Sequence, residues 1–553
     1  MTQVQQPRSK ETPILMTHSI CPECNQTLPT AIFEREQKVW IRKECPQHGE
    51  FEDLYFGSYE TYLKFSRFAH EGRGIKNPQI SKEKYACPED CGLCGDHLTH
   101  TALANLVATN RCDLTCWYCF FYAKKGIDGG YIYEPTLDQV RDMAKTLRAQ
   151  KPVPGKAIQI TGGEPALRED LVDIIKILKE EHIEHVQLNT NGIKLATDPD
   201  FAREVREAGV NTVYLSFDGV TAKTNPKNHW EVPYALDNCR SVGLGIVLVP
   251  TVLRTVNDHE LSAIIRYAQR NIDIIRSVNF QPVSLVGRTP REERMKFRIT
   301  IPDCMKLIEE QTEGEIPTSA WFPVPSCVPI THFVEGLTKK EEYELSIHFA
   351  CGAGTYVFKD GDRLTPISSF VDIEGLFEYL REKSDELKEG ASKIWVGTKM
   401  MSKLGSFIDK KKQPQELRVA KLLFNALVRH DYSALGDFHK KSLFLGMMHF
   451  QDKYNQDIER VKRCDIHYLT PDKRIIPFCA FNVIPEWYRD PIQQKYGLPT
   501  GEWEKKTGKK LEDSMYRGEL RRRPHHSNCG CPKAGEYSAR DAEHTCTNLY
   551  QKN

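Results

Sequence analysis

The chain has 553 residues, of which 40% are hydrophobic, so it is long enough to form more than one domain. Acidic and basic residues nearly cancel and leave a formal charge of +1, which argues against a dedicated nucleic-acid-binding protein, because such proteins normally carry a basic excess. No apolar run is as long as a membrane span, and the N-terminal residues lack the apolar core of a signal peptide. We therefore expect a cytoplasmic protein.

Cysteine is unusually abundant, with 18 residues, and many of them stand close together in the sequence. The cytosol keeps thiols reduced, so disulfides are rare there. Short cysteine spacings in such a compartment are typical of metal sites. We therefore treat each cysteine group as a candidate metal centre.

Residues 1–100 are predicted to form a small β-rich metal module. Residues 39–56 alternate between apolar and polar side chains around a turn, which is typical of two paired strands. Cys21 and Cys24, together with Cys45 and His48, match a rubredoxin-like or zinc-ribbon-like site for a mononuclear iron or zinc. An alternative set of four ligands, Cys21, Cys24, Cys91 and Cys94, is left open by the spacing.

A second cysteine group in this module has the pattern Cys87-x3-Cys91-x2-Cys94. Three cysteines at this spacing can hold an iron–sulfur cluster. We interpret the group as an auxiliary [4Fe–4S] site. A second catalytic cluster, or a zinc site shared with Cys21 and Cys24, are the alternatives.

Residues 101–285 alternate between short apolar runs and amphipathic stretches. One stretch, 171–183, carries apolar residues at helical spacing behind an acidic pair that favours a helix start. Six β–α units in series predict an α/β fold with a parallel sheet, and six are too few for a complete eight-stranded barrel, so we expect a partial (β/α)6 barrel. The six runs that we predict as strands are residues 103–109, 157–161, 185–190, 212–217, 245–251 and 278–284.

Residues 286–500 are predicted to form a mainly helical region, and 501–553 a polar tail. Long helical patterns cover 371–390 and 416–430, and 432–450 carries a broad apolar face that we assign to a helix. The proline-rich run 321–330 predicts an ordered loop, and 466–478 predicts a hairpin.

Three cysteines in this region, Cys351, Cys464 and Cys479, are predicted to gather as a second auxiliary cluster. Burial in the core is the alternative for each of them, since free cysteine is often buried. The remaining cysteines are assigned to the core, to loops or to the tail: Cys239, Cys304, Cys327, Cys529, Cys531 and Cys546.

The loop after the first predicted strand contains Cys112-x3-Cys116-x2-Cys119. Three thiolates can hold three irons of a cubane cluster and leave the fourth iron open for a small chelating ligand. A zinc knuckle is the alternative, but structural zinc normally takes four protein ligands. The motif therefore predicts a catalytic [4Fe–4S] cluster.

This cysteine motif resembles that of the radical S-adenosylmethionine superfamily, in which S-adenosylmethionine chelates the open iron and is cleaved to a radical. The resemblance implies that Cys112, Cys116 and Cys119 carry the catalytic cluster. Tyr118, before the third cysteine, is also typical of the superfamily. The segment Thr161-Gly-Gly-Glu-Pro165 resembles its second motif. Residues at similar positions bind S-adenosylmethionine in the superfamily, which implies this role for Gly162, Gly163, Glu164, Asn189, Ser216, Asp218 and Val249.

Longer strings, over about residues 15–490, are similar to the archaeal tetraether lipid synthase family; among them are 86–120, 351–358 and 463–479. That resemblance implies an enzyme that joins terminal methyl carbons of archaeal ether lipid chains. It also implies a reducing electron donor such as ferredoxin, peripheral contact with the inner membrane surface, and no nucleic acid as a partner. The basic residues Arg521–Arg523 could contact anionic headgroups.

Three other functions compete with lipid coupling. A radical methyltransferase acting on a pterin-type cofactor precursor fits the same motifs, since close relatives are associated with that activity. A peptide-modifying radical enzyme would carry a winged-helix recognition segment, which the sequence lacks. An iron–sulfur electron-transfer module would need no nucleotide site, so the Gly162-Gly163-Glu164 segment argues against it.

Overall fold

The structure is a computed structural model, and it describes residues 12–82, 84–121, 130–286, 292–414, 419–424 and 441–522. The tail cysteines Cys529, Cys531 and Cys546 lie outside the described residues, as does Arg523. Within the described part of the chain, no helix is both long and apolar enough to cross a membrane.

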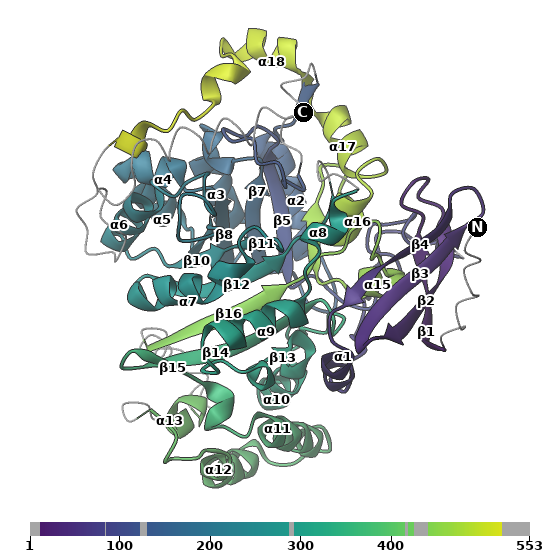
Figure 1. Ribbon diagram of the computed structural model, residues 1–553, viewed down its shortest axis with the longest axis vertical. Coiled ribbons are helices and arrows are strands. Elements are labelled where there is room, and N and C mark those ends of the chain that lie inside the picture. The colour runs from purple at the N-terminus through teal and green to yellow at the C-terminus, as the bar shows by residue number, and fades with distance from the viewer. Residues whose placement is uncertain are drawn as a thin grey trace, which may run out of the picture.

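A large sheet forms the centre of the molecule (Figure 1). Strands from the predicted β–α units lie parallel in its middle, and each buries apolar side chains at matching levels. For example, Leu106, Ile160 and Leu188 are neighbours on three adjacent strands, and all are fully buried. The parallel strands, in spatial order, are β17 (Ile466–Leu469), β5 (Leu103–Thr109), β7 (Ala157–Gly162), β8 (His185–Thr190), β9 (Thr212–Ser216), β10 (Ile246–Val249), β12 (Ile275–Pro282) and β16 (Ser442–Met448).

The predicted α/β class and partial barrel are confirmed, because the six apolar runs overlap six strands of an open sheet, namely β5, β7, β8, β9, β10 and β12. Helices connect these strands in sequence (Figure 1). The predicted helix at 171–183 is α3, and α2 begins at a capping box formed by Thr136 and Gln139. The connecting helices are α2 (Leu137–Arg148), α3 (Leu171–Glu180), α4 (Ile193–Thr197), α5 (Pro199–Ala208), α6 (Val232–Ser241) and α7 (Leu261–Arg270).

The C-terminal region is helical over much of its length and also supplies strands to the central sheet. Helices α10 to α13 form a lobe below the sheet in Figure 1, and α11 confirms the predicted helix at 371–390. The hairpin predicted at 466–478 is formed by β17 and β18. The helices are α8 (Arg294–Phe297), α9 (Ile301–Gln311), α10 (Val328–Thr338), α11 (Ile373–Lys388), α12 (Lys393–Lys403), α13 (Val419–Phe424), α15 (Ile458–Lys462), α16 (Phe478–Val483), α17 (Arg489–Tyr496) and α18 (Thr500–Thr507).

The helix predicted over 432–450 is wrong where the structure describes this segment, because residues 442–448 form strand β16. Leu443, Leu445 and Met447 are buried, while Phe444 between them is 37% exposed, which is the period-two pattern of a strand. β16 pairs with β12 on one side and with antiparallel β14 on the other. Hydrogen bonding to these two strands holds residues 442–448 in an extended conformation, although their apolar pattern alone predicted a helix.

The remaining strands outside the N-terminal module extend the central sheet or form a small separate sheet. β13 pairs with β14 just before the start of α10, so the predicted ordered loop at 321–330 contains a short strand and a helix start. These strands are β6 (Tyr131–Ile132), β11 (Thr251–Val252), β13 (Phe322–Pro323), β14 (Gly352–Asp360), β15 (Arg363–Pro366), β18 (Ile475–Pro477) and β19 (Leu498–Pro499).

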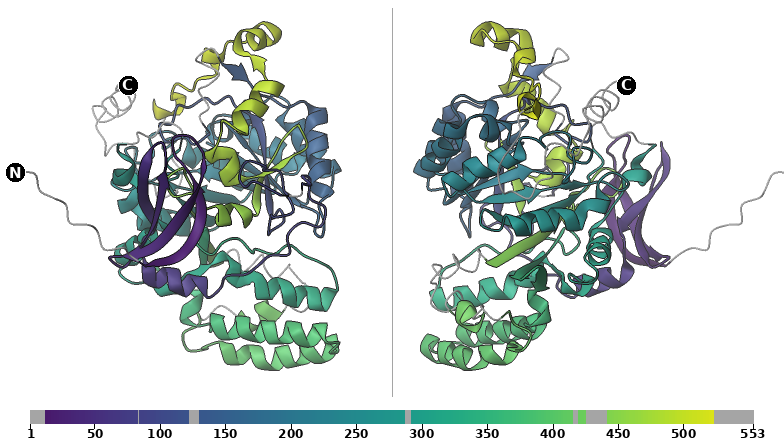
Figure 2. Two further views of the ribbon diagram at one scale, coloured as in Figure 1. Left: turned by 90° about the vertical axis from the view of Figure 1, so that its right-hand side faces the viewer. Right: turned by 60° about the vertical axis from the view of Figure 1, so that its left-hand side comes forward.

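A separate four-stranded antiparallel sheet, followed by helix α1 (Tyr59–Ser66), forms the N-terminal module beside the central sheet (Figure 2). A buried ion-pair group holds it there. Arg298, 1% exposed, donates from Nε to Asp53 at 3.0 Å and from Nη1 to Asp452 at 2.6 Å. The strands of the module are β1 (Pro13–Ile20), β2 (Thr27–Arg35), β3 (Lys38–Cys45) and β4 (Gly49–Phe56).

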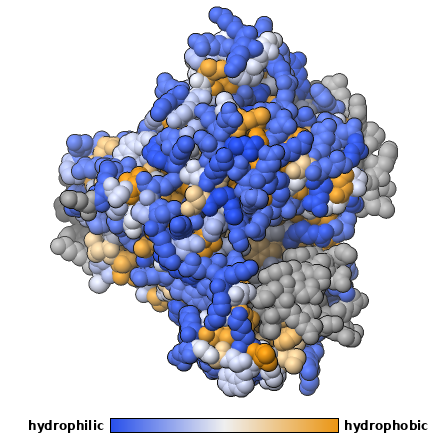
Figure 3. Space-filling model, turned by 180° about the vertical axis from the view of Figure 1, so that it is seen from behind, coloured by the Kyte–Doolittle hydropathy of each residue, from blue (hydrophilic) through white to orange (hydrophobic). Residues whose placement is uncertain are grey.

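The rear of the molecule presents a mostly hydrophilic surface in which apolar residues are scattered (Figure 3). The domain boundaries at residues 100, 285 and 500 remain predictions. The central sheet continues across the boundary at 285, because β16 and β17 belong to the C-terminal region and β5 and β12 to the barrel.

Candidate active site and metal centres

The predicted catalytic cysteines lie beyond the carboxyl end of β5, at the edge where the parallel strands of the barrel end. In parallel α/β sheets this edge is where ligands bind. Cys112, Cys116 and Cys119 line one cavity, and within their loop the backbone N–H of Cys119 donates to Cys116 O at 3.3 Å. The same cavity is lined by other predicted site residues: Tyr118, Gly162, Gly163, Glu164, Asn189 and Ser216.

Gly162 and Gly163 bring the turn after β7 against the backbone that leads into the cysteine loop. A Cβ at Gly162 would lie 2.1 Å from Thr109 O, and a Cβ at Gly163 would lie 2.0 Å from Arg111 O. Gly162 also has a φ of +141°. The N–H of Gly163 donates to Thr109 O at 2.9 Å. The glycines are therefore needed for contact between two loops, as well as for any approach of a ligand.

Glu164 is buried and connects the turn after β7 to the end of β8. Its carboxylate accepts hydrogen bonds from Ala166 N at 2.9 Å, Thr190 Oγ1 at 2.7 Å and Asn191 N at 2.7 Å. Burial and the nearby Asp113 raise the pKa of Glu164 to about 8, against the effect of these donors. Its carboxylate thus organises the loop that lines the cavity.

Lys227 is a buried cation at this site that the sequence analysis missed. Its ammonium lies 2.6 Å from Asp218 and 3.2 Å from the hydroxyl of Tyr118, and it also donates to Ser216. Tyr118 donates to Asp218 as well. The sequence signal, a lysine nine residues after the strand-end Asp218, is too ordinary to single out.

Several further residues that the sequence analysis missed also line this cavity. They come from β11 (Thr251–Val252), from the end of β12 and the residues directly after it, and from the segment after β16: Thr251, Gln281, Pro282, Val283, Ser284 and Phe450. Val249, by contrast, is not among the residues that line the cavity; it ends β10 as the register partner of Ser216. Asp218 is not among the lining residues either, but it contacts two of them, Tyr118 and Lys227.

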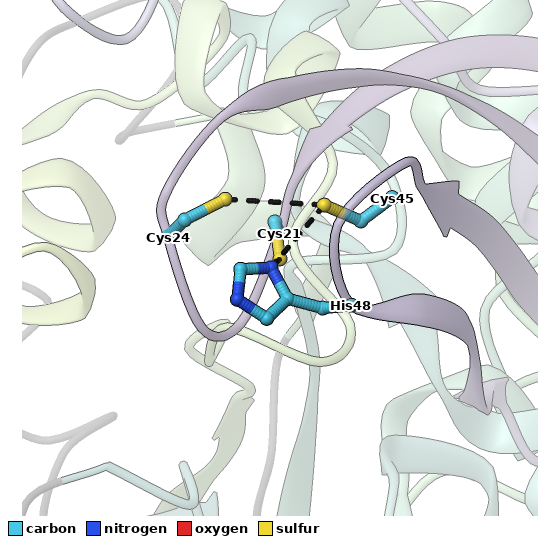
Figure 4. A group of neighbouring side chains, drawn as sticks. All are labelled: Cys21, Cys24, Cys45 and His48. Atoms are coloured by element: carbon cyan, nitrogen blue, oxygen red, sulfur yellow. Dashed lines mark hydrogen bonds between the residues drawn. The ribbon is translucent and has the colours of Figure 1, made fainter.

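The N-terminal module brings together the four predicted ligands of a mononuclear site (Figure 4). Cys21 and Cys24 follow β1, whereas Cys45 and His48 come from the turn between β3 and β4. His48 Nδ1 lies 3.6 Å from Cys21 Sγ and 3.4 Å from Cys45 Sγ, and Cys24 Sγ lies 3.9 Å from Cys45 Sγ. These separations suit tetrahedral zinc or iron with ligand bonds of about 2.0–2.3 Å.

The alternative pairing of Cys21 and Cys24 with Cys91 and Cys94 is wrong. Cys91 and Cys94 line a different cavity together with Cys87. The Cys87 and Cys91 thiols lie close enough to raise the pKa of Cys91, together with burial. The chemistry of this donor set fits an iron–sulfur cluster.

The third cysteine group stands where two strands begin. Cys351 precedes β14, Cys464 precedes β17, and Cys479 lies in α16 after β18. Burial raises the pKa of Cys464, and the neighbouring Cys479 raises it further. Arg460 Nε donates to Cys351 Sγ at 3.2 Å. Tertiary structure thus draws together thiols that are far apart in sequence, whereas Cys239 and Cys304 lie in the apolar core as predicted.

Comparison with known proteins shows the family of this chain. A model of the radical S-adenosylmethionine superfamily matches residues 106–268, and a model described as the HMPTM N-terminal zinc ribbon domain matches 14–57. A 7,8-dihydro-6-hydroxymethylpterin dimethyltransferase of Methanocaldococcus jannaschii is 43% identical over 500 residues, which are 88% of this chain and 97% of that protein. The chain belongs to the family of this radical S-adenosylmethionine protein.

Other similarities cover smaller parts of the chain. A GTP 3',8-cyclase of Clostridium acetobutylicum is 32% identical over 207 residues, which are 36% of this chain and 63% of the cyclase. A solved radical SAM methyltransferase from Sphaerobacter thermophilus is 14% identical, with a TM-score of 0.29 over 56% of this chain and 75% of that one.

Membership of this family corrects the predicted resemblance to archaeal tetraether lipid synthases. That resemblance and the lipid-coupling function derived from it are wrong. The relative that is matched over 97% of its length is named as a dimethyltransferase of a pterin. The ether lipid partner and membrane contact have no support. The cysteine and Gly-Gly-Glu motifs are predicted to bind the cluster and S-adenosylmethionine, so they carry little information about the substrate.

The family establishes the enzyme class and its cofactors. The protein is a radical S-adenosylmethionine enzyme that uses [4Fe–4S] clusters and S-adenosylmethionine, needs a reductant, and has a metal-binding N-terminal module. The three thiols around one cavity, next to the turn after β7, fit this chemistry. The individual ligand and binding residues remain predictions.

Proposed function

We propose that this enzyme methylates a reduced pterin of the 7,8-dihydro-6-hydroxymethylpterin type. The observation that carries the proposal is the 43% identity with the dimethyltransferase of Methanocaldococcus jannaschii, which extends over 97% of that protein. The match covers 88% of this chain, so it extends well beyond residues 106–268, which match the superfamily model.

The cavity beyond the cysteine loop has the chemical character that a pterin requires. A pterin is flat and carries hydrogen-bonding groups along its edge. Phe120 and Phe450 supply aromatic surface to the cavity, and Phe450 is stacked on Phe478 at 3.8 Å between ring centroids. Gln281 and Ser284 add polar groups on the same wall. An aromatic surface with a few polar groups is typical of a site for a small heterocycle.

We assign two tasks to the residues that line the cavity. The side with the three cysteines, Gly163 and Lys227 is suited to hold the cluster and S-adenosylmethionine, which together supply radical chemistry when bound. Lys227 offers a buried ammonium for an anionic group of the cofactor, with Asp218 holding it in place. The side with Gln281 and Phe450 would hold and orient the pterin.

The test is an anaerobic reaction of the reconstituted full chain with a reductant, 7,8-dihydro-6-hydroxymethylpterin and S-adenosylmethionine carrying a deuterated methyl group. Mass spectrometry should detect a methylated pterin, and the label shows whether its methyl group comes from S-adenosylmethionine. The Cys116→Ala variant should give neither this product nor 5'-deoxyadenosine.

A second variant separates the substrate from the cofactor. Gln281→Leu should lower methylation of the pterin roughly 10-fold or more, because it removes a side-chain amide that we expect to hydrogen-bond the pterin. Loss of one hydrogen bond costs about 1.5 kcal/mol. Cleavage of S-adenosylmethionine should continue in this variant. If the wild-type enzyme cleaves S-adenosylmethionine but leaves the pterin unmodified, the pterin is not the substrate.

A further inference from the structure

The cavity lined by Cys87, Cys91 and Cys94 offers three thiols, whereas a cubane cluster has four irons to ligate. Asp90 also lines this cavity, but its carboxylate already accepts hydrogen bonds from Lys82 and, at 3.1 Å, from the N–H of Ala86. The remaining metal-ligating side chain on the described wall of the cavity is His97.

His97 reaches the cavity because of a tight local turn. Its N–H donates to Cys94 O at 3.1 Å, so the histidine lies one turn beyond the last cysteine. The residue is 95% buried, with 5% of its surface exposed. The pattern is thus Cys87-x3-Cys91-x2-Cys94-x2-His97, with all four side chains on one cavity.

The hydrogen bonds of His97 fix which ring nitrogen carries the proton. Nε2 lies 2.8 Å from the carbonyl oxygen of Cys464, and a carbonyl can only accept. Nε2 must therefore be the protonated nitrogen. Thr99 Oγ1 and His467 Nε2 also lie 3.1 Å from this same nitrogen.

The other ring nitrogen, Nδ1, is left with its lone pair. Within the described parts of the chain it has no hydrogen-bond partner. Histidines that bind metals have this arrangement: one nitrogen donates to a backbone carbonyl, and the other is held toward the metal in the correct tautomer.

We propose that Nδ1 of His97 is the fourth protein ligand of the auxiliary [4Fe–4S] cluster bound by Cys87, Cys91 and Cys94. The proposal rests on the assignment of these three cysteines to a cluster and is independent of the identity of the substrate. It also connects two metal centres, since the same imidazole donates to the carbonyl of Cys464 in the third cysteine group.

The experiment is pulsed electron paramagnetic resonance on the dithionite-reduced holoenzyme, prepared from the full chain with natural or 15N-labelled histidine. The wild type should show a strong coupling to a histidine nitrogen that changes with the label. His97→Ala should lose this coupling. His97→Cys should keep the wild-type iron content without the coupling, and its cluster should have a lower reduction potential, because histidine ligation raises it.

The matched control is His467→Gln, which alters a neighbour of Nε2 away from the cavity and should retain the coupling. A wild type without histidine coupling, or a His97→Ala variant with the full coupling, would overturn the proposal. Cys91→Ser tests the cysteine assignment separately: it should lose iron, and an unchanged iron content would show that these thiols hold no cluster.

Discussion

At the residue scale, the site depends on a few side chains whose surroundings decide their chemistry. Cys112, Cys116 and Cys119 were identifiable from their spacing, because all three lie within eight residues of one loop. Lys227 was not, since its role arises from contact with Asp218 and Tyr118, which come from other elements. A lysine is almost never fully buried without such a partner.

Lys227→Met is expected to weaken binding of S-adenosylmethionine about 10- to 100-fold, because a hydrogen bond to a charged group contributes about 1.5–3 kcal/mol. Isothermal titration of the anaerobically reconstituted enzyme measures this affinity. Lys223→Met, at an exposed position on the same segment, is the control and should bind normally. Equal affinities of the two variants would remove Lys227 from the binding site.

At the scale of elements, buried charges join segments that are distant in the chain. Arg298 follows α8, Asp53 lies in β4, and Asp452 follows β16. Both carboxylates are fully buried and face the same guanidinium. Such a group contributes little net stability compared with an apolar replacement, but removal of one partner leaves an uncompensated charge.

Asp53→Asn should therefore lower stability by about 3–5 kcal/mol. The measurement is the apparent thermal midpoint together with limited proteolysis, which should cut the N-terminal module first. Glu374→Gln breaks an ion pair with Arg67 whose side chains are 43% and 63% exposed. This control should cost about 0–1 kcal/mol. If the two variants unfold alike, Arg298 does not hold the module.

At the scale of the whole molecule, a barrel with an open edge is completed by segments from both ends of the chain. The N-terminal module packs beside it, and the C-terminal region adds β16 and β17 at opposite edges of the parallel strands. Each addition brings its own cysteine group. The protein thus combines several cysteine groups with one barrel.

Cys45→Ser should remove the metal of the N-terminal module while the iron of the clusters remains. A tetrahedral site with three protein ligands binds zinc or iron much more weakly than one with four. Elemental analysis of the purified protein counts the metal, and Cys239→Ala, a core cysteine, serves as the control. A full complement of metal in Cys45→Ser would exclude this site.

The sequence by itself determined the order of the β–α units, the cysteine loop after β5 and the turn after β7. These features are encoded by neighbouring residues, through apolar periodicity, ligand spacing and glycine. Only the tertiary structure decided that residues 442–448 form a strand and that Phe450, Gln281 and Lys227 line the cavity. Those outcomes depend on pairing across the sheet and on burial, which bring together residues whose distance along the chain leaves no local pattern.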